Sequence, residues 1–246
     1  MGRLLCVVYG AFAYLLFLAT WVYFIGFLSG IAVPKSVDSA PPAGALEAVA
    51  WDLGLLTIFF AHHSVMARAG AKRILTKAIS PVVERSTYVL VASLALGLVF
   101  WQWRPLPQVV WQAHGLARVG ILVGFWVGVI VTLAAANMIN GLEVFGLRQV
   151  LVHYQGRVLE SARFVTPGLY RLVRHPMMTG ILLVLWCAPT MSQGRLLLAT
   201  TMSVYIVVAV KFLEERDLRK TFGAKYERYQ REVPMVIPYK GVRRAP

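Results

Sequence analysis

Six long apolar segments constrain the fold of this chain more than any other feature of its sequence. They cover about Leu4–Ile31, Val49–Met66, Tyr88–Trp103, Val119–Met138, Met178–Met191 and Leu196–Leu213. A helix needs about 20 mainly apolar residues to cross a bilayer, and most of these segments approach that length. We therefore predict an all-α, polytopic membrane protein with about six inserted helices, in which residues 1–246 form a single domain.

The composition of the chain agrees with this interpretation. Hydrophobic residues make up 58% of the sequence and charged residues only 15%, whereas about a quarter of a soluble domain is charged. The formal net charge of +14 is interpreted as loop charge that sets membrane orientation, because no nucleic-acid-binding motif accompanies it. Arginine and lysine concentrate in the second and fourth connections and in the C-terminal tail. The positive-inside rule then predicts that these regions and both termini face the cytoplasm.

The last two apolar segments form a predicted helical hairpin, since only the sequence SQGR separates them and Gly194 favours a turn. The stretch before the first arm is TPGLYRLVRHP. Its Pro-Gly pair predicts a turn, which is followed by Arg171, Arg174, His175 and Pro176. Proline disfavours a helical residue before it, so we expect His175 just outside the helix, where free N–H groups attract an anion. Alternatively, the two arginines anchor the hairpin to lipid phosphates.

Two carboxylates, Glu214 and Glu215, end the second arm of the hairpin. A short connection between the arms returns them to the level of the arginine and histidine that precede the first arm. A cationic ligand would be bracketed between these carboxylates and the arginines, although a simple salt bridge between the arms is the alternative. Further on, FGAKYERYQREVPMVIP places Tyr226 and Tyr229 three residues apart, on one face of a helix.

These C-terminal motifs together resemble the signature of a membrane enzyme family. GLYRLVRHPMMTG, EERDL and FGAKYERYQREVPMVIP are similar to the signature of integral-membrane methyltransferases related to isoprenylcysteine carboxyl methyltransferase. WDLGLLTIFFAHHSVMAR, FWQWRP and FGLRQV resemble one branch of that superfamily, the bacterial methanethiol S-methyltransferases, and the likeness runs from about Trp51 to Pro238. Met178 departs from a signature tyrosine, and Gly141 and Glu143 stand where the branch often has histidine and aspartate.

The resemblance implies S-adenosyl-L-methionine as cofactor, bound by about residues 140–240, and methanethiol as the acceptor that becomes dimethyl sulfide. The thiolate is the nucleophilic form of a thiol, and a cation at Arg148 or His175 would favour it. The implied catalytic residues are Arg148, His175 and Glu214. The implied cofactor contacts are Tyr170, Arg174, His175, Pro176, Gly180, Glu214, Glu215, Tyr226 and Tyr229, and the implied substrate contacts are Glu143, Gln149 and Trp186.

The resemblance also implies a location in the bacterial cytoplasmic membrane, with the active site facing the cytoplasm. Expected partners are a small thiol and membrane lipid, with no nucleic acid and no obligatory protein partner. No metal is expected, since neither a Cys pair nor an HxxxH spacing occurs. Two alternatives remain: a related methyltransferase with a larger thiol, carboxylate or lipid acceptor, and a haem- or quinone-binding membrane protein that uses His62, His63 and His175.

Overall fold

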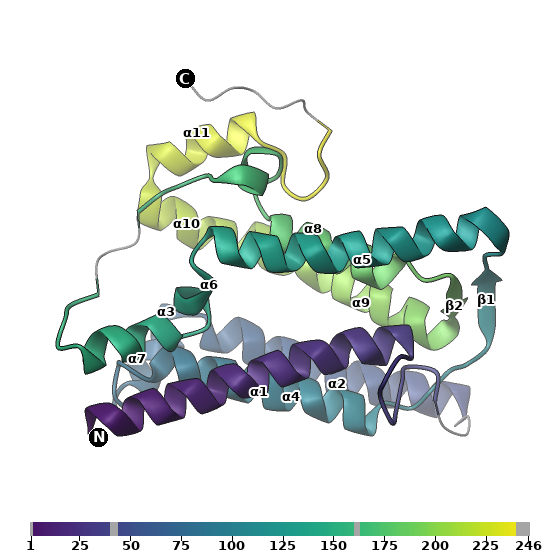
Figure 1. The fold of residues 1–246 in the computed structure, drawn as a ribbon, viewed down its shortest axis with the longest axis horizontal. Helices are drawn as coiled ribbons and strands as arrows, with labels where there is room; N and C mark the ends of the chain where they lie inside the picture. Colours follow the sequence, from purple (N-terminus) through teal and green to yellow (C-terminus); the bar gives the residue numbers. More distant parts are fainter. Residues whose placement is uncertain (1, 40–43, 160–162, 240–246) are drawn as a thin grey trace. The chain divides into compact units, whose positions relative to one another are not determined.

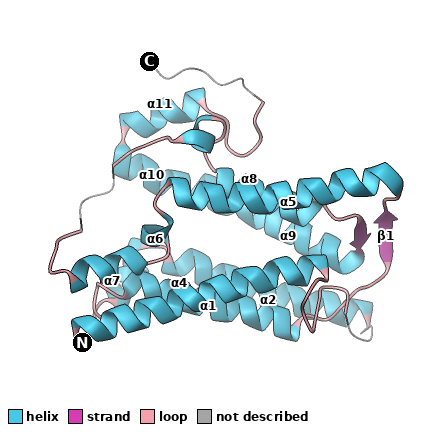
Figure 2. Ribbon diagram, viewed as in Figure 1, coloured by secondary structure: helices cyan, strands magenta, loops and turns pink. Residues whose placement is uncertain are grey.

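Helices account for most of the structure, a computed structural model that describes residues 2–39, 44–159 and 163–239 (Figure 1, Figure 2). Each predicted apolar segment corresponds to a helix, although the segment Met178–Met191 extends past the end of α8 and into a short strand. These helices are α1 (Arg3–Ser29), α2 (Ala45–Met66), α4 (Glu84–Gln102), α5 (Gly115–Met138), α8 (Pro176–Trp186) and α9 (Gln193–Val208). The all-α prediction is therefore confirmed. Positions 240–246 of the predicted basic tail lie outside the described residues.

Four helical runs in the described part of the chain are long and apolar enough to cross a membrane. They are α1, α2, α5 and the run Gln193–Phe222, which α9 begins. Helix α8 is shorter but apolar, and α4 begins with the charged residues Glu84 and Arg85. The chain is a multi-pass membrane protein, while insertion of α4 and α8 stays a prediction.

The chain divides into two compact units. The first contains Met1–Val109, Gly141–Glu160 and Ser192–Leu197, and the second contains Val110–Asn140, Ser161–Met191 and Leu198–Pro246.

In the first unit, α4 packs against α1 and α2, and three short helices gather at one end of them (Figure 1). These short helices are α3 (Ala69–Leu75), α6 (Gly141–Val144) and α7 (Leu147–Tyr154). Helix α7 lies against α1 where Gly10 lacks a side chain, because a carbon added there would be 2.6 Å from Val150 Cγ2. Val150 is buried and Tyr154 is exposed, as expected of an amphipathic helix in the connection before the Arg-His-Pro motif.

In the second unit, α5 and α8 approach each other closely at glycines. A carbon added at Gly180 would lie 2.2 Å from Thr132 Oγ1 and 2.6 Å from the carbonyl oxygen of Gly128. Small residues let membrane helices approach this closely. The absence of a side chain at Gly180 therefore fixes how α8 packs on α5.

Short elements complete the second unit around these helices. The 3₁₀ helix η1 (Gly168–Arg171) precedes α8, while α10 (Glu215–Phe222) and α11 (Ala224–Glu232) follow the apolar run. Gly168 has a φ of +47°, which agrees with the predicted Pro-Gly turn. A two-stranded sheet joins β1 (Val109–Gln112) to β2 (Thr190–Ser192).

The turn of the C-terminal hairpin was predicted at the wrong residues. Gly194 lies in the first turn of α9, and the connection from α8 instead contains β2. The reason is a helix cap, because the Ser192 hydroxyl accepts a hydrogen bond of 3.1 Å from the N–H of Arg195. The first N–H groups of a helix have no carbonyl partner within the helix, and a serine at this position accepts a hydrogen bond from one of them. Helix α9 therefore begins at Gln193, before the predicted apolar segment that starts at Leu196.

The two glutamates of the motif lie where the long helix changes its hydrogen bonding. A π-helical segment, η2 (Ala209–Glu214), joins α9 to α10. Such segments are rare and frequently occur at functional sites. The wider turn changes the directions in which Glu214 and Glu215 point.

Candidate active site

His175 occupies the position directly before α8. Its backbone (φ −126°, ψ 64°) is not helical and Pro176 begins the helix, as the sequence predicted. The N–H groups of Arg174 and His175 donate to the carbonyl oxygens of Pro234 (2.8 Å) and Met235 (3.0 Å). The segment after α11 thus takes both of these donors, while the expected attraction of an anion to the first N–H groups of α8 stays a prediction.

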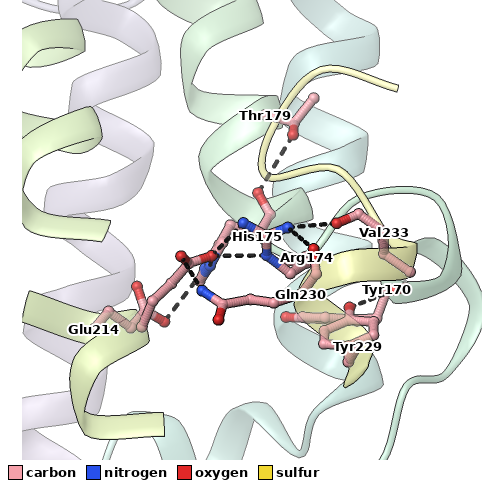
Figure 3. A network of polar contacts seen from close by, with 9 residues as sticks. Tyr170, Arg174, His175, Thr179, Glu214, Tyr229, Gln230 and Val233 are labelled. Atoms are coloured by element: carbon pink, nitrogen blue, oxygen red, sulfur yellow. Dashed lines mark hydrogen bonds and ion pairs between the residues drawn. The ribbon is translucent and has the colours of Figure 1, made fainter. Parts of the chain in front are cut away.

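The imidazole of His175 lies between two carboxylates (Figure 3). Its Nδ1 is 3.5 Å from Glu214 Oε1, and its Nε2 is 3.2 Å from Glu215 Oε1. The predicted return of the glutamates to the level of this histidine is confirmed. The Glu215 side chain is only 5% exposed, whereas that of Glu214 is 48% exposed. Of the two, Glu214 therefore has carboxylate surface available to a ligand.

Arg174 joins Glu215 to the C-terminal segment. Its Nε and Nη2 each lie 2.7 Å from Glu215 Oε1, and its Nη1 donates to the carbonyl oxygens of Gln230 (3.0 Å) and Val233. The Gln230 side chain donates to the other Glu215 oxygen at 2.6 Å. These contacts make the guanidinium a brace within the protein. Arg174, His175, Glu214 and Glu215 are called the His175 cluster below.

Three tyrosines of the motifs lie beside this cluster. The Tyr229 hydroxyl donates to the carbonyl oxygen of Tyr170 at 2.5 Å, and the rings of Tyr226 and Tyr229 meet edge to face at 5.9 Å. Tyr226 is 2% exposed, and its buried hydroxyl has no hydrogen-bond partner among the described residues. Buried polar groups are rarely left unpaired, so this hydroxyl is a candidate for ligand contact.

The carboxylates keep the His175 ring protonated near neutral pH. Burial lowers the pKa of His175, but the hydrogen bonds and charges of Glu214 and Glu215 outweigh burial and raise that pKa to about 9. Both ring nitrogens then act as donors. Burial also raises the pKa of the Tyr170 and Tyr229 hydroxyls, which therefore stay neutral. The cluster can bind and orient a charged ligand, but its histidine is no proton acceptor at pH 7.

Two predicted site residues of α8 do not join the cluster. Gly180 contacts α5 and has a packing role. Trp186 ends the helix, about 15 Å along the axis from Pro176 at 1.5 Å per residue, and its indole N–H donates to Ser203 Oγ at 2.9 Å. The structure thus places Trp186 away from the histidine.

The predicted residues Glu143, Arg148 and Gln149 form one group in the first unit. Arg148 makes an ion pair with Glu143, and their side chains are 37% and 27% exposed. The Gln149 amide donates to the carbonyl oxygen of Glu143 at 3.0 Å. The role of this group toward an acceptor stays a prediction.

Sequence reasoning missed three residues that support the site. Gln230 binds Glu215, the Thr179 hydroxyl donates to the carbonyl oxygen of Val236 at 2.7 Å, and Phe164 packs edge to face on Tyr226 and Tyr229. Thr179 follows the Arg-His-Pro motif and Gln230 follows the second tyrosine, so proximity to the motifs was an available signal. Phe164 had none beyond its aromatic ring.

The fold and site define a class: a multi-pass α-helical membrane protein with a buried ionic cluster where a short helix begins. The family model described as "NnrU protein" matches residues 53–242. The chain belongs to this family.

The chain is also similar to characterised relatives over nearly its whole length. "Methanethiol S-methyltransferase 2" of Bradyrhizobium diazoefficiens is 43% identical over 243 residues, which cover 99% of this chain and 93% of the relative. "Methanethiol S-methyltransferase" of Mycobacterium tuberculosis is 45% identical over 240 residues, or 97% and 98% of the two chains. "Nurim" of Sus scrofa is 37% identical over 184 residues, or 71% and 69%. No solved structure matches the chain significantly.

Proposed function

We propose that this chain is an S-methyltransferase that moves the methyl group of S-adenosylmethionine to methanethiol and so forms dimethyl sulfide. One observation carries the proposal: relatives named methanethiol S-methyltransferase are 43% and 45% identical over 99% and 97% of the chain. Their names give the reaction. The His175 cluster and the tyrosines beside it supply a chemical reason to assign the cofactor site to the second unit.

The residues around His175 fit a cofactor that carries a sulfonium, an ammonium and a carboxylate. The half-exposed carboxylate of Glu214 suits the cationic groups, and the unpartnered Tyr226 hydroxyl offers a buried hydrogen-bond donor. We assign Glu214, Tyr170, Tyr226 and Tyr229 to cofactor contact. When bound, the cofactor supplies a methyl group on positively charged sulfur.

The other predicted cofactor residues are assigned to the framework that positions Glu214. His175 donates to Glu214 and Glu215, and Arg174 ties Glu215 to the C-terminal segment. Buried charges are retained when they are paired and hydrogen-bonded. Pro176 and Gly180 fix the start and the packing of α8. In this assignment the framework holds one carboxylate oxygen of Glu214 and leaves the other for the ligand.

The acceptor requires a different cation. Methyl transfer is an in-line displacement that depends on the orientation of thiolate and methyl group. We assign Arg148 to the thiolate, because an opposite charge within a few ångström lowers an acid's pKa by about 1–3 units. His175 is a poorer choice, since two carboxylates already balance its charge. Glu143 and Gln149 are assigned to holding Arg148, and Trp186 is assigned no role.

We further assign the chain to the cytoplasmic membrane of a bacterium, with the active site on the cytoplasmic side. Two arguments support this orientation. The connections that carry the motifs are rich in arginine and lysine, which favours the cytoplasmic side. The methanethiol S-methyltransferase relatives are bacterial.

Headspace gas chromatography tests the proposed function. Purified protein in detergent receives methanethiol and S-adenosylmethionine, and dimethyl sulfide is measured over time. The proposal expects product that depends on both compounds and on intact protein. Folded, cofactor-binding protein that forms no dimethyl sulfide would overturn the acceptor assignment, and a Soret absorption band in the purified protein would favour the haem-binding alternative.

A further inference from the structure

The first unit contains a pocket whose lining includes Gln149, the residue whose amide donates to the carbonyl oxygen of Glu143. It measures about 240 Å³ and lies between α7 and the turn that precedes α4. Val82, Val152 and Leu159 supply apolar lining, while His153 and Arg157 supply polar and charged lining. A pocket with this mixed lining suits a ligand that is partly apolar and carries negative charge.

A second arginine lies beside this pocket. A side-chain carbon added at Gly156 would be 3.4 Å from Nη1 of Arg3, so the Arg3 guanidinium is adjacent to the residue that precedes Arg157. Among the described residues, neither arginine has a salt-bridge or hydrogen-bond partner for its side chain. We call this site the Arg3–Arg157 pocket. Arg157 in the lining and Arg3 beside the adjacent Gly156 give this site positive charge that attracts an anion.

The position of α1 puts this pocket at a membrane surface. Arg3 is the first residue of α1, a helix of 27 residues and thus about 40 Å in length. The hydrocarbon core of a bilayer is about 30 Å thick, so the ends of α1 reach the headgroups. Directly after Arg3, the side chains of Leu4, Leu5 and Val8 are 64%, 60% and 58% exposed. Apolar surface for acyl chains therefore begins next to the arginines.

We infer that the Arg3–Arg157 pocket binds the headgroup phosphate of an anionic phospholipid whose acyl chains lie along the exposed apolar side of α1. Basic sites at the cytoplasmic ends of membrane helices bind such headgroups. Arg3 and Arg157 face the phosphate charge, and Val82, Val152 and Leu159 contact the glycerol and the upper acyl chain.

Native mass spectrometry of the full chain in detergent tests the inference with phosphatidylglycerol as the anionic lipid and phosphatidylcholine as the neutral one. The double variant Arg3→Gln/Arg157→Gln is compared with Arg73→Gln/Lys77→Gln, which removes two exposed positive charges from the same unit. Each basic residue near anionic lipid contributes about 1 kcal/mol. The first double variant should therefore bind phosphatidylglycerol about 30-fold more weakly, a change of about 2 kcal/mol, and the second should change affinity less than about twofold.

Three results would overturn the inference. These are equal losses in the two double variants, equal affinity of the parent for both lipids, and displacement of phosphatidylglycerol by inorganic phosphate at the same concentration, which would indicate a site for a soluble anion. If the double variant does not fold, as judged by circular dichroism, the single variants decide. Arg157→Lys should retain the preference for phosphatidylglycerol, and Arg157→Gln should reduce it.

Discussion

The His175 cluster and the Arg3–Arg157 pocket both contain positively charged side chains, but the surroundings of these charges differ. In the cluster, Arg174 is part-buried and contacts Glu215, and the buried His175 contacts both Glu214 and Glu215. In the pocket, the arginines have no partner among the described residues. Paired, buried charges fix the geometry of a site, whereas unpaired charges at a surface leave capacity for a ligand.

The same contrast exists inside the cluster, between neighbouring glutamates. Glu215 is 5% exposed and forms hydrogen bonds with Arg174, His175 and Gln230. Glu214 is 48% exposed and, of these three residues, contacts only His175. Glu215 should therefore affect stability, and Glu214 should affect cofactor affinity.

The largest effect on stability is expected from Glu215→Gln. Removing this carboxylate leaves Arg174 buried without its ionic partner, and breaking a buried pair costs about 3–5 kcal/mol. Thermal unfolding in detergent measures the effect. Glu227→Gln, at an exposed position of α11, is the control and should stay within about 0.5 kcal/mol of the parent. Equal stability of the two variants would contradict a stabilising role for the Glu215 carboxylate.

Gly180→Ala should also destabilise the second unit, by about 3 kcal/mol, at the upper end of overpacking costs. The added methyl carbon would lie 2.2 Å from Thr132 Oγ1, so α8 would have to shift. His175, which directly precedes α8, would shift with it. Gly120→Ala on α5 is the matched control, because no atom lies within 4 Å of the carbon added there. The comparison fails if the two alanine variants unfold at the same temperature.

Stability should fall as the pH rises through the range in which His175 loses its proton. Its pKa is raised from an ordinary value of 6.5 to about 9, so its contribution is complete below pH about 6.5 and is lost as the pH rises through about 9. Linkage gives a loss of about 2 kcal/mol between pH 7 and pH 9. Of the neighbouring groups Arg174, Glu214 and Glu215, the last has a lowered pKa, because hydrogen bonds from His175 and Arg174 outweigh its burial, so Glu215 stays charged in this range.

Unfolding midpoints of the parent and of His175→Gln across this range measure that loss. The tyrosines beside the cluster, Tyr170, Tyr226 and Tyr229, have raised pKa values and should not contribute below pH 9. The variant should therefore lack the slope. The same slope in both proteins would assign the pH dependence to other groups.

The smallest effect is expected at the ion pair of Arg148 and Glu143. Both side chains are partly exposed, at 37% and 27%, and pairs of this kind contribute about 0–1 kcal/mol. Arg148→Met should therefore leave the unfolding temperature nearly unchanged. If it also lowers dimethyl sulfide formation near pH 7, with partial recovery at higher pH, the thiolate assignment is supported. An unchanged rate and pH profile would contradict it.

Much of the fold could be predicted because apolar length and helix termini are local properties. The apolar segments became helices, Pro176 placed His175 outside α8, and the hairpin brought the glutamates back to it. The turn at Gly194 was predicted wrongly because Ser192, a helix cap, lay in the same SQGR sequence. Two local signals competed there, and the cap determined where α9 begins.

The division of roles in the site could not be predicted in the same way. Glu214 and Glu215 are identical residues side by side, and only the π-helical segment and the contacts of Arg174 decide which is buried. Likewise, Gly180 was assigned to the cofactor because it lies in the motif, whereas its contact with Thr132 belongs to α5, distant in sequence. Such contacts depend on tertiary packing and leave no pattern in the local sequence.

Calorimetric titration of S-adenosylmethionine into the parent, Glu214→Gln and Glu227→Gln proteins tests whether Glu214 contacts the cofactor. The His175 cluster should bind the cofactor through the exposed carboxylate of Glu214, and losing a charge-assisted contact costs about 1.5–3 kcal/mol. The account therefore predicts an affinity about 10- to 100-fold lower for Glu214→Gln, with Glu227→Gln and the parent alike. Equal affinities for all three proteins, each folded, would contradict it.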